Sequence, residues 1–193
     1  MPAKIKKTQP ETPNISQGRD CFQTPNYATE LLIPLIPKNI TNIWEPACGK
    51  LKISNVLSDN GYYVFSSDLG YPDESDNFLT SEFPFPTYKN NCAIITNPPF
   101  SLKSKFYNRC KYFKVPFALL IPGDYSGWII DAIRFDNCEK IIPTRRIDYI
   151  TPSGLSGASG HSSNFHSYWL TWGFGLGKSE TFVELTKEMK TNI

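Results

Sequence analysis

The chain has 193 residues, of which 40% are hydrophobic, 14% aromatic and 20% charged, and its formal net charge is +2. This length and composition fit one globular domain, and the small net charge means that nucleic-acid affinity would have to come from a local basic patch. The sequence contains neither an apolar run of membrane-spanning length nor the apolar core of an amino-terminal signal peptide, so we expect a cytoplasmic protein without a membrane partner.

The first 17 residues are polar and carry Lys4, Lys6 and Lys7, with no periodic pattern to bury. We therefore predict a mobile basic tail over residues 1–17 and a single domain over residues 18–193. The five cysteines are odd in number, lie far apart and form no CxxC pair. They predict reduced, mostly buried thiols, and we expect no metal site.

A helical pattern follows the segment FQTP at residues 22–25. Its apolar positions share one face until Pro34 and Pro37 end the helix, and they are Tyr27, Leu31, Leu32 and Leu35.

Residues 43–49 (IWEPACG) read as an apolar strand that runs into an acid, a proline and small residues. A helix up to Gly61 and a second apolar run at residues 62–65 follow, and Asp68 comes after that run. A strand, a small-residue turn and a helix bring backbone N–H groups close to a ligand. An acid at the end of the second strand, about 20 residues later, is placed to bind both hydroxyls of a ribose. This pattern predicts a nucleoside cofactor.

Residues 92–100 (CAIITNPPF) are predicted to form a strand buried on both faces that ends at its prolines. The Asn97 side-chain oxygen and the Pro98 carbonyl are two acceptors aimed at one spot, and Phe100 adds a flat apolar face. This arrangement suits a planar NH2 group, whose nitrogen becomes more nucleophilic when both of its hydrogens are accepted. A simple strand-ending turn is the alternative interpretation of these residues taken alone.

Taken in this order, the segments at residues 22–25, 45–49 and 97–100, with Asp68, resemble the motif series of S-adenosylmethionine-dependent amino-methyltransferases. They are most similar to the DNA adenine-N6 methyltransferases, over roughly residues 20–174. The resemblance implies a Rossmann-like class I methyltransferase fold, with a seven-stranded, mainly parallel sheet, helices on both faces and an antiparallel final strand pair. It also implies direct methyl transfer from S-adenosylmethionine to the N6 amine of adenine in DNA, with the adenine flipped out of a duplex and stacked on Phe100.

The resemblance further assigns roles to individual residues. It assigns the methionine end of the cofactor to Thr24 and Pro25, and the cofactor floor to Glu45, Pro46, Ala47, Cys48 and Gly49. Asp68 would bind the ribose, and Asp76 or Asn77 would meet the adenine amino group of the cofactor, in a stretch similar to the Asp-Phe-Leu element of the family. The catalytic residues would be Asn97, Pro98, Pro99 and Phe100.

The chain departs from the family at Leu51, where a second glycine is usual. A side chain there would crowd the turn that approaches the cofactor. This departure keeps open a non-catalytic nucleic-acid-binding module that retains the fold. Within the same chemistry, adenine in RNA or a glutamine side chain in a protein is an alternative substrate, because both present planar amines.

Residues 101–114 are predicted to form a helix with two stripes and no acidic residue. An apolar stripe would face the sheet, at Leu102, Phe106, Cys110 and Phe113. A basic stripe would contact nucleic-acid phosphates, through Lys103, Tyr107, Lys111 and Lys114, with Lys105 and Arg109 nearby. A solvated helix face is the alternative for this stripe.

The remainder predicts a buried strand at residues 116–122, a helix through residues 128–133, and final strands at residues 141–150 and 168–174. A Gly/Ser-rich loop at residues 151–164 lies between the last two. Arg145 and Arg146 are further predicted phosphate contacts. His161 and His166 are interpreted as loop and surface residues, because no cysteine or acid cluster accompanies them. No separate target-recognition domain is predicted, so specificity would be loose or supplied by a protein partner or a homodimer.

Overall fold

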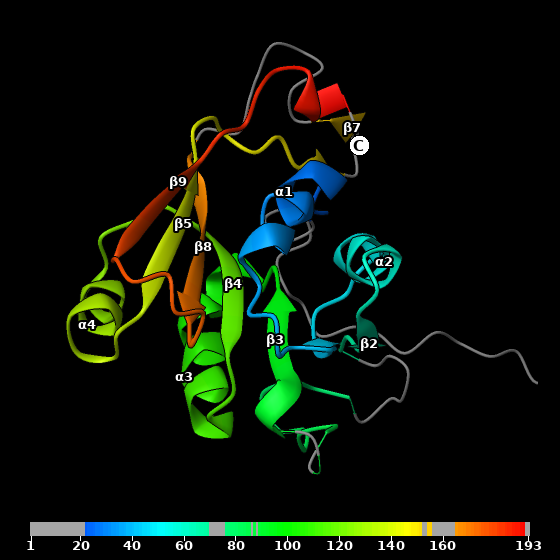
Figure 1. Ribbon diagram of the computed structural model, residues 1–193, viewed down its shortest axis with the longest axis vertical. Coiled ribbons are helices and arrows are strands. Elements are labelled where there is room, and N and C mark those ends of the chain that lie inside the picture. The colour runs from blue at the N-terminus through cyan, green and yellow to red at the C-terminus, as the bar shows by residue number, and fades with distance from the viewer. Residues whose placement is uncertain are drawn as a thin grey trace, which may run out of the picture.

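Short apolar runs form the strands of a seven-stranded mixed sheet (Figure 1). The computed structural model describes residues 22–69, 76–85, 87, 89–151, 154–155 and 165–191. The predicted tail at residues 1–17 and most of the Gly/Ser-rich loop, with His161, lie outside the described residues. In order across the sheet, the strands are β2 (Tyr63–Ser66), β1 (Asn42–Glu45), β3 (Cys92–Thr96), β4 (Phe117–Pro122), β8 (Ser167–Trp172), β5 (Glu139–Pro143) and β9 (Glu180–Val183). β6 (Ile150–Thr151) and β7 (Gly154–Leu155) form a separate hairpin.

Most neighbouring strands of the large sheet are parallel. β2, β1, β3 and β4 run in one direction, β8 runs antiparallel to both of its neighbours, and β5 and β9 are parallel to each other. The predicted α/β class with a mainly parallel seven-stranded sheet is therefore confirmed, as is the antiparallel pairing of the strands near residues 141 and 168. Because β8 alone is reversed, the carboxyl ends of the other six strands lie at the same edge of the sheet.

Two strand predictions near the carboxyl terminus were wrong in detail. β5 begins at Glu139 and ends at Pro143, well before residue 150, and the next residue, Thr144, bonds with Val183 at the end of β9 and with Leu185 beyond it. β9 itself was not predicted. It is an edge strand with alternating exposure, and its Phe182 side chain is 66% exposed, so no continuous apolar run marks it.

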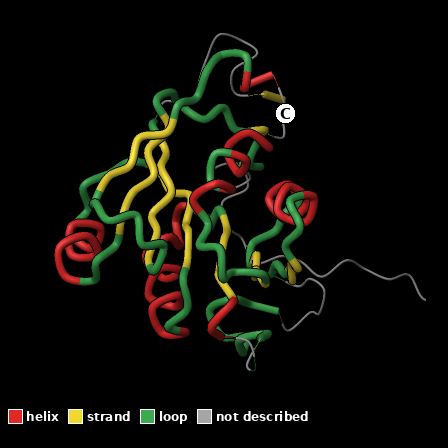
Figure 2. The backbone as a smooth tube through the Cα atoms, viewed as in Figure 1, coloured by secondary structure: helices red, strands yellow, loops and turns green. Residues whose placement is uncertain are grey.

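Helices cover both faces of the sheet, as predicted (Figure 2). The side chains of α1 (Asn26–Glu30) and α2 (Lys52–Asp59) pack on one face, and those of α3 (Lys103–Phe113) and α4 (Gly127–Phe135) pack on the other. Short 3-10 turns complete the chain, at η1 (Ile33–Leu35), η2 (Lys89–Asn91), η3 (Phe100–Leu102) and η4 (Met189–Thr191). Among the described residues, no helix has the length and apolar composition needed to cross a lipid bilayer.

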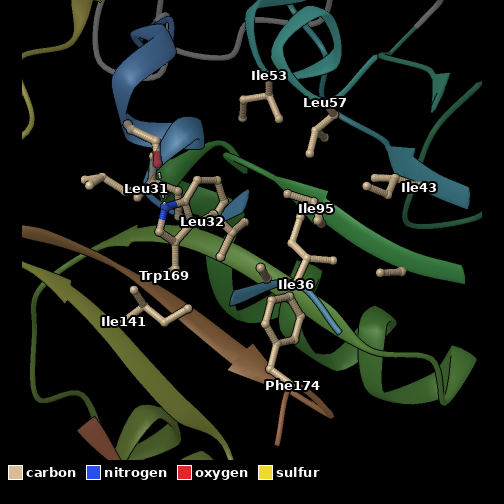
Figure 3. Close-up of a cluster of buried hydrophobic side chains, with 14 of the residues drawn as sticks. Leu31, Leu32, Ile36, Ile43, Ile53, Leu57, Ile95, Ile141, Trp169 and Phe174 are labelled. Carbon is tan, nitrogen blue, oxygen red and sulfur yellow. Dashed lines mark hydrogen bonds between the residues drawn. The ribbon is translucent and has the colours of Figure 1, made fainter. Parts of the chain in front are cut away.

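The core is divided between the two faces because successive strand residues point to opposite sides. Ile95 belongs to the cluster under α1 and α2, whereas Ile94 belongs to the cluster under α3 and α4. In the first cluster, the Trp169 indole N–H donates to the Ala28 carbonyl at 3.0 Å and so fastens α1 to the sheet (Figure 3). The segment just before α1 is thereby held over the carboxyl edge of the strands, where the predicted site residues lie.

Candidate functional site at the carboxyl edge of the sheet

Three adjacent parallel strands bring most of the predicted site residues to one edge. Glu45 is the last residue of β1, Asp68 lies two residues after β2, and Asn97 follows β3 directly. Since these strands are neighbours in the order β2-β1-β3, their carboxyl ends lie side by side. The arrowhead of β3 points toward the end of the molecule at which α1 and β7 lie (Figure 1). This is the edge at which open α/β sheets bind ligands.

The turn after β1 has the tight geometry that its sequence predicted. Gly49 has a positive φ of 48°, and a Cβ at this position would lie 2.8 Å from the amide of Gln23. The Lys50 N–H donates to the Gln23 side-chain oxygen at 2.9 Å. A residue with a side chain at position 49 would be strained and would displace the Gln23 amide, so both the backbone conformation and the contact with Gln23 favour glycine. Gln23 belongs to the segment FQTP at residues 22–25, but the sequence did not predict that it supports this turn.

Leu51, the departure from the family pattern, also adopts a left-handed conformation, with φ 60° and ψ 21°. Its N–H donates to the Cys48 carbonyl at 2.7 Å, and its own carbonyl accepts from Asn55 in α2. The backbone therefore follows a path that favours glycine although the residue is leucine. A branched side chain in this region costs on the order of 1–2 kcal/mol, so the departure is accommodated as local strain.

Glu45 lies beneath the turn, 1% exposed, and one of its carboxyl oxygens accepts from the Ser54 hydroxyl. The Ser54 hydroxyl also lies 2.6 Å from that of Ser66. Burial raises the pKa of Glu45 to about 8, against the lowering effect of the Ser54 bonds. Burial likewise raises the pKa of the Cys48 thiol to about 12, with Asp68 and Glu45 adding to the effect. Of the predicted cofactor floor, Pro46 is also buried and Ala47 half-buried, and Gly49 is exposed.

The Asp68 carboxylate closes the turn from the side of β2. One of its oxygens accepts from the Gly49 N–H and the other from the Leu69 N–H, both at 2.7 Å. Asp68 is half-buried and forms no ion pair within the described part of the chain. Each carboxylate oxygen has a further lone pair, so the group can still accept hydrogen bonds from hydroxyl donors.

The segment with Asp76 and Asn77 is anchored by an aromatic side chain. Phe78 is 4% exposed and packs 5.0 Å from Trp44 and 4.6 Å from Phe106, measured between ring centroids. The Asn77 side-chain oxygen accepts from the Leu79 N–H at 3.0 Å, as in an Asx turn. Asn77 therefore has a structural role in shaping this loop.

The Asn97 side chain is satisfied on one side only. Its amide nitrogen donates to the Phe22 carbonyl at 3.2 Å, and its oxygen is buried with no hydrogen-bond partner in the described structure. Buried polar atoms are almost always paired, because an unpaired one costs roughly 1–3 kcal/mol. Pro98 is buried and Pro99 half-buried, and η3 begins directly after them at Phe100.

Phe100 belongs to an aromatic cluster that the sequence did not predict. Its ring stacks on Phe22 at 5.6 Å and 24°, and meets Tyr149 and Phe165 edge-on at 5.9 and 5.6 Å. A planar group that stacks on Phe100 has to use the ring face that Phe22 leaves open, or displace Phe22. We call Phe22, Phe100, Tyr149 and Phe165 the aromatic cluster.

The segment before α1 crosses this edge and contacts both halves of the site. Gln23 exchanges two backbone hydrogen bonds with Ile150, at 2.9 and 3.0 Å. Thr24 is 3% exposed, and Pro25 is buried and precedes the first turn of α1. The predicted methionine-end residues thus directly follow Phe22 and Gln23, which contact Asn97 and the Gly49 turn.

The basic residues of α3 differ from the predicted stripe. Lys103 forms an ion pair with Asp124, and Lys111 forms one with Asp136 at 2.6 Å. Tyr107 is wrong as a member of an exposed stripe, because it is 4% exposed and its hydroxyl donates to Asp136. The apolar stripe is confirmed, since three of its members are buried, namely Phe106, Cys110 and Phe113.

Arg109 holds a neighbouring loop instead of facing solvent. Its guanidinium donates to the carbonyls of Phe78 and Ser81 and lies 4.5 Å from the Phe113 ring centroid. Lys105 and Lys114 are exposed and form no ion pair within the described structure. The helix contains no acidic residue, and the acids that pair with its lysines come from other segments of the chain.

Arg145 and Arg146 lie just beyond β5, exposed, at the same edge of the sheet. They border a cavity together with His166 and with Lys187 and Lys190, two lysines that were not predicted to take part in a site. Lys187 and Lys190 lie among acidic residues in the sequence, a pattern that is typical of an exposed, solvated surface. The described residues contain no group of three or more His, Cys, Asp or Glu arranged to bind a metal.

In comparisons with known protein families and with curated proteins, neither a family nor a protein matches this chain.

Proposed function

We propose that this chain transfers a methyl group from S-adenosylmethionine to the N6 amine of adenine in DNA, on a Rossmann-like class I methyltransferase fold. The observation that carries the proposal is the buried side-chain oxygen of Asn97, which has no hydrogen-bond partner in the described structure. An acceptor in this state is costly for the protein alone, and a planar amine that enters the site would satisfy it. Electrostatic preorganisation of this kind acts most strongly as charge develops on the reacting nitrogen.

The residues of the Gly49 turn support the cofactor assignment. The Asp68 carboxylate has remaining lone pairs and no cationic partner in the described structure, which suits the two hydroxyls of a ribose. The adenine amino group would be met by Asp76 or Asn77, since the Asn77 oxygen accepts from the Leu79 N–H and keeps a further lone pair. Thr24 and Pro25, which follow the Gln23 that contacts the turn, would meet the methionine end. The cofactor, when bound, supplies an activated methyl group.

The chain's own residues would then orient the amine and exclude water. Asn97 and Pro98 accept from the two amine hydrogens, which directs the nitrogen lone pair toward the methyl group. Phe100 holds the ring plane, and the other members of the aromatic cluster enclose it. Because the methyl donor is already activated, positioning the reactants supplies much of the rate acceleration and no side chain needs to attack the substrate.

The test is incubation with methyl-labelled S-adenosylmethionine and, separately, duplex DNA, single-stranded DNA, RNA and a protein extract. We expect label in DNA, on adenine N6. Asn97→Ala should lower turnover by about a hundredfold or more while cofactor affinity barely changes. Asp68→Ala should do the reverse, weakening cofactor binding by roughly 1.5–3 kcal/mol, as expected for hydrogen bonds to a charged group.

Asn97→Asp is the matched control, because its carboxylate still accepts from the amine but cannot donate to the Phe22 carbonyl. It should retain more turnover than Asn97→Ala. Label in RNA or protein alone would replace DNA with one of the other planar-amine substrates. Absence of label together with absence of cofactor binding would contradict the proposed activity and favour the non-catalytic nucleic-acid-binding module.

A further inference from the structure

A basic cavity of about 490 Å³ opens at the carboxyl end of β5. Each of its lining residues has a cationic or polar side-chain group, and they are Thr144, Arg145, Arg146, His166, Lys187 and Lys190. We call these six residues the basic pocket. They come from three parts of the chain, of which the last was not predicted to contribute to a site.

Specific contacts hold the carboxyl-terminal part of the chain against this edge. The Thr144 N–H donates to the Val183 carbonyl at 2.9 Å, and the Thr144 hydroxyl accepts from the Leu185 N–H at 3.0 Å. Leu185 is 0% exposed and packs in the same core cluster as Tyr149. Lys190 pairs with Asp148 at 2.8 Å. The basic pocket is therefore built by tertiary contacts and is not a chance grouping of surface side chains.

Positive charge is concentrated in the basic pocket although the whole chain carries only +2. Its four lysine and arginine side chains face two nearby carboxylates. Asp148 pairs with Lys190. The pKa of Glu188 is lowered chiefly because its carboxylate accepts from its own backbone N–H and from the Thr186 side chain, with Arg145 and Lys187 contributing.

His166 adds a neutral hydrogen-bonding group to the basic pocket. Burial and the charge of Arg146 lower the pKa of His166, and its Nδ1 is buried with no partner in the described structure. Guanidinium groups bind phosphate oxygens in a bidentate manner, and lysines add point charge. The lining therefore suits a phosphate group.

The basic pocket adjoins the aromatic cluster through His166 and through Asp148, the ion-pair partner of Lys190. Asp148 is followed by Tyr149, whose ring lies 5.6 Å from that of Phe22. His166 is preceded by Phe165, whose ring lies 5.6 Å from that of Phe100. Phe165 and His166 are consecutive residues, so the basic pocket and the aromatic cluster are neighbours at the carboxyl edge of the sheet.

We infer that the basic pocket binds a backbone phosphate of the nucleic acid whose base enters the aromatic cluster. The identity of the substrate rests on the proposed function, whereas the phosphate contact rests on the basic pocket itself. Phosphate contacts fix register without reading sequence, so the basic pocket would position the strand and leave base selection to the Asn97 site.

The test compares two charge-matched double variants. Arg145→Gln with Lys187→Gln removes two exposed cations of the basic pocket, neither of which forms an ion pair within the described structure. Lys38→Gln with Lys178→Gln removes two exposed lysines that precede β1 and β9, at the opposite edge of the sheet. Binding of a fluorescent single-stranded oligodeoxyadenylate is measured by anisotropy over a salt series.

The basic-pocket variant should bind at least about tenfold more weakly at low salt, and the log–log salt slope should fall by roughly one. The control should keep the wild-type slope, and both variants should keep wild-type affinity for S-adenosylmethionine. An unchanged slope in the basic-pocket variant, or an equal loss in the control, overturns the inference. Displacement of the oligonucleotide by an equal concentration of inorganic phosphate also overturns it, because the basic pocket would then be a small-anion site.

The same proteins separate this inference from the proposed function. Salt-dependent binding by the wild type that is lost in the basic-pocket variant, without methyl transfer to any substrate, supports the phosphate site and contradicts the methyltransferase activity. Methyl transfer to DNA with an unchanged salt slope in the basic-pocket variant supports the methyltransferase activity and contradicts the phosphate site.

Discussion

Polar and charged side chains cluster both on the face of the sheet under α3 and at its carboxyl edge, but their hydrogen bonding differs between the two regions. Under α3, Lys103 and Lys111 are paired with aspartates and Arg109 donates to two backbone carbonyls. At the carboxyl edge, the oxygen of Asn97 and Nδ1 of His166 are buried without partners in the described structure. The Tyr168 hydroxyl, in the cluster under α3 and α4, is also unpaired in the described structure, so an unpaired atom points to a ligand only where other site residues surround it, as they do Asn97.

The carboxyl groups of the two regions should respond to pH in opposite ways, and this is the largest effect expected. Burial raises the pKa of Glu45 from 4.5 to about 8, so its contribution to stability is complete below about pH 4.5 and is lost as the pH rises to about 8. The fall from about pH 5 to about pH 8 should be on the order of 3 kcal/mol. Urea unfolding of the wild type and Glu45→Gln over this range measures it, and the variant should lack the fall.

Asp136, under α3, should give stability the opposite pH dependence. Hydrogen bonds from Lys111 and Tyr107 lower its pKa below 3.8, so its contribution is present above that value and is lost as the pH falls. Asp136→Asn should therefore flatten the acid side of the stability profile. A Glu45→Gln variant that still loses stability toward pH 8 would show that another group causes the fall.

Variants of Arg109, under α3, and of Arg145, at the carboxyl edge, should separate an effect on stability from an effect on nucleic-acid binding. Arg109→Ala removes two charge-assisted hydrogen bonds and the packing on Phe113, so it should lower the free energy of unfolding by about 2 kcal/mol. Arg145→Ala removes an exposed side chain and should change stability by less than about 0.5 kcal/mol.

Oligonucleotide binding by the folded Arg109 and Arg145 variants completes this experiment. We expect the salt slope to change in Arg145→Ala and to stay at the wild-type value in Arg109→Ala. A loss of phosphate contact in Arg109→Ala at a temperature where it is folded would return α3 to the nucleic-acid interface.

The smallest expected effect concerns two of the three left-handed non-glycine residues in the described structure, Lys114 at the end of α3 and Leu51 at the carboxyl edge, with φ values of 56° and 60°. Lys114→Gly places the favoured residue at a helix terminus and should raise the free energy of unfolding by roughly 0.5–1 kcal/mol. Leu51→Gly relieves similar strain but removes a half-buried side chain, so its net effect on stability should be smaller.

Cofactor affinity shows whether Leu51 crowds the turn. Since the backbone at Leu51 already follows a glycine-like path, Leu51→Gly should leave the affinity for S-adenosylmethionine within about threefold, or about 0.7 kcal/mol. Calorimetric titration measures this, with Lys114→Gly as the control. Tenfold tighter binding by Leu51→Gly would mean that the leucine obstructs the cofactor.

The sequence by itself determined the elements that rest on local patterns. Residues 92–96 are apolar and end at prolines, and they form a strand buried on both faces that stops at Asn97. The small residues after Glu45 and the acid at position 68 meet at one edge, because parallel strands joined by a helix have to place their carboxyl ends together. Side-chain periodicity and the conformational limits of proline and glycine act over a few residues, so a sequence reveals them directly.

The tertiary structure alone decided which polar groups find partners. Asp124 pairs with Lys103 from the loop between β4 and α4, and Asp136 pairs with Lys111 from the end of α4. No local sequence pattern predicts these pairs. Lys187 and Lys190 join Arg145 and Arg146 because β9 lies parallel to β5 at the edge of the sheet. Charge pairing depends on distances between segments far apart in sequence, and those distances are set by the packing of the whole chain.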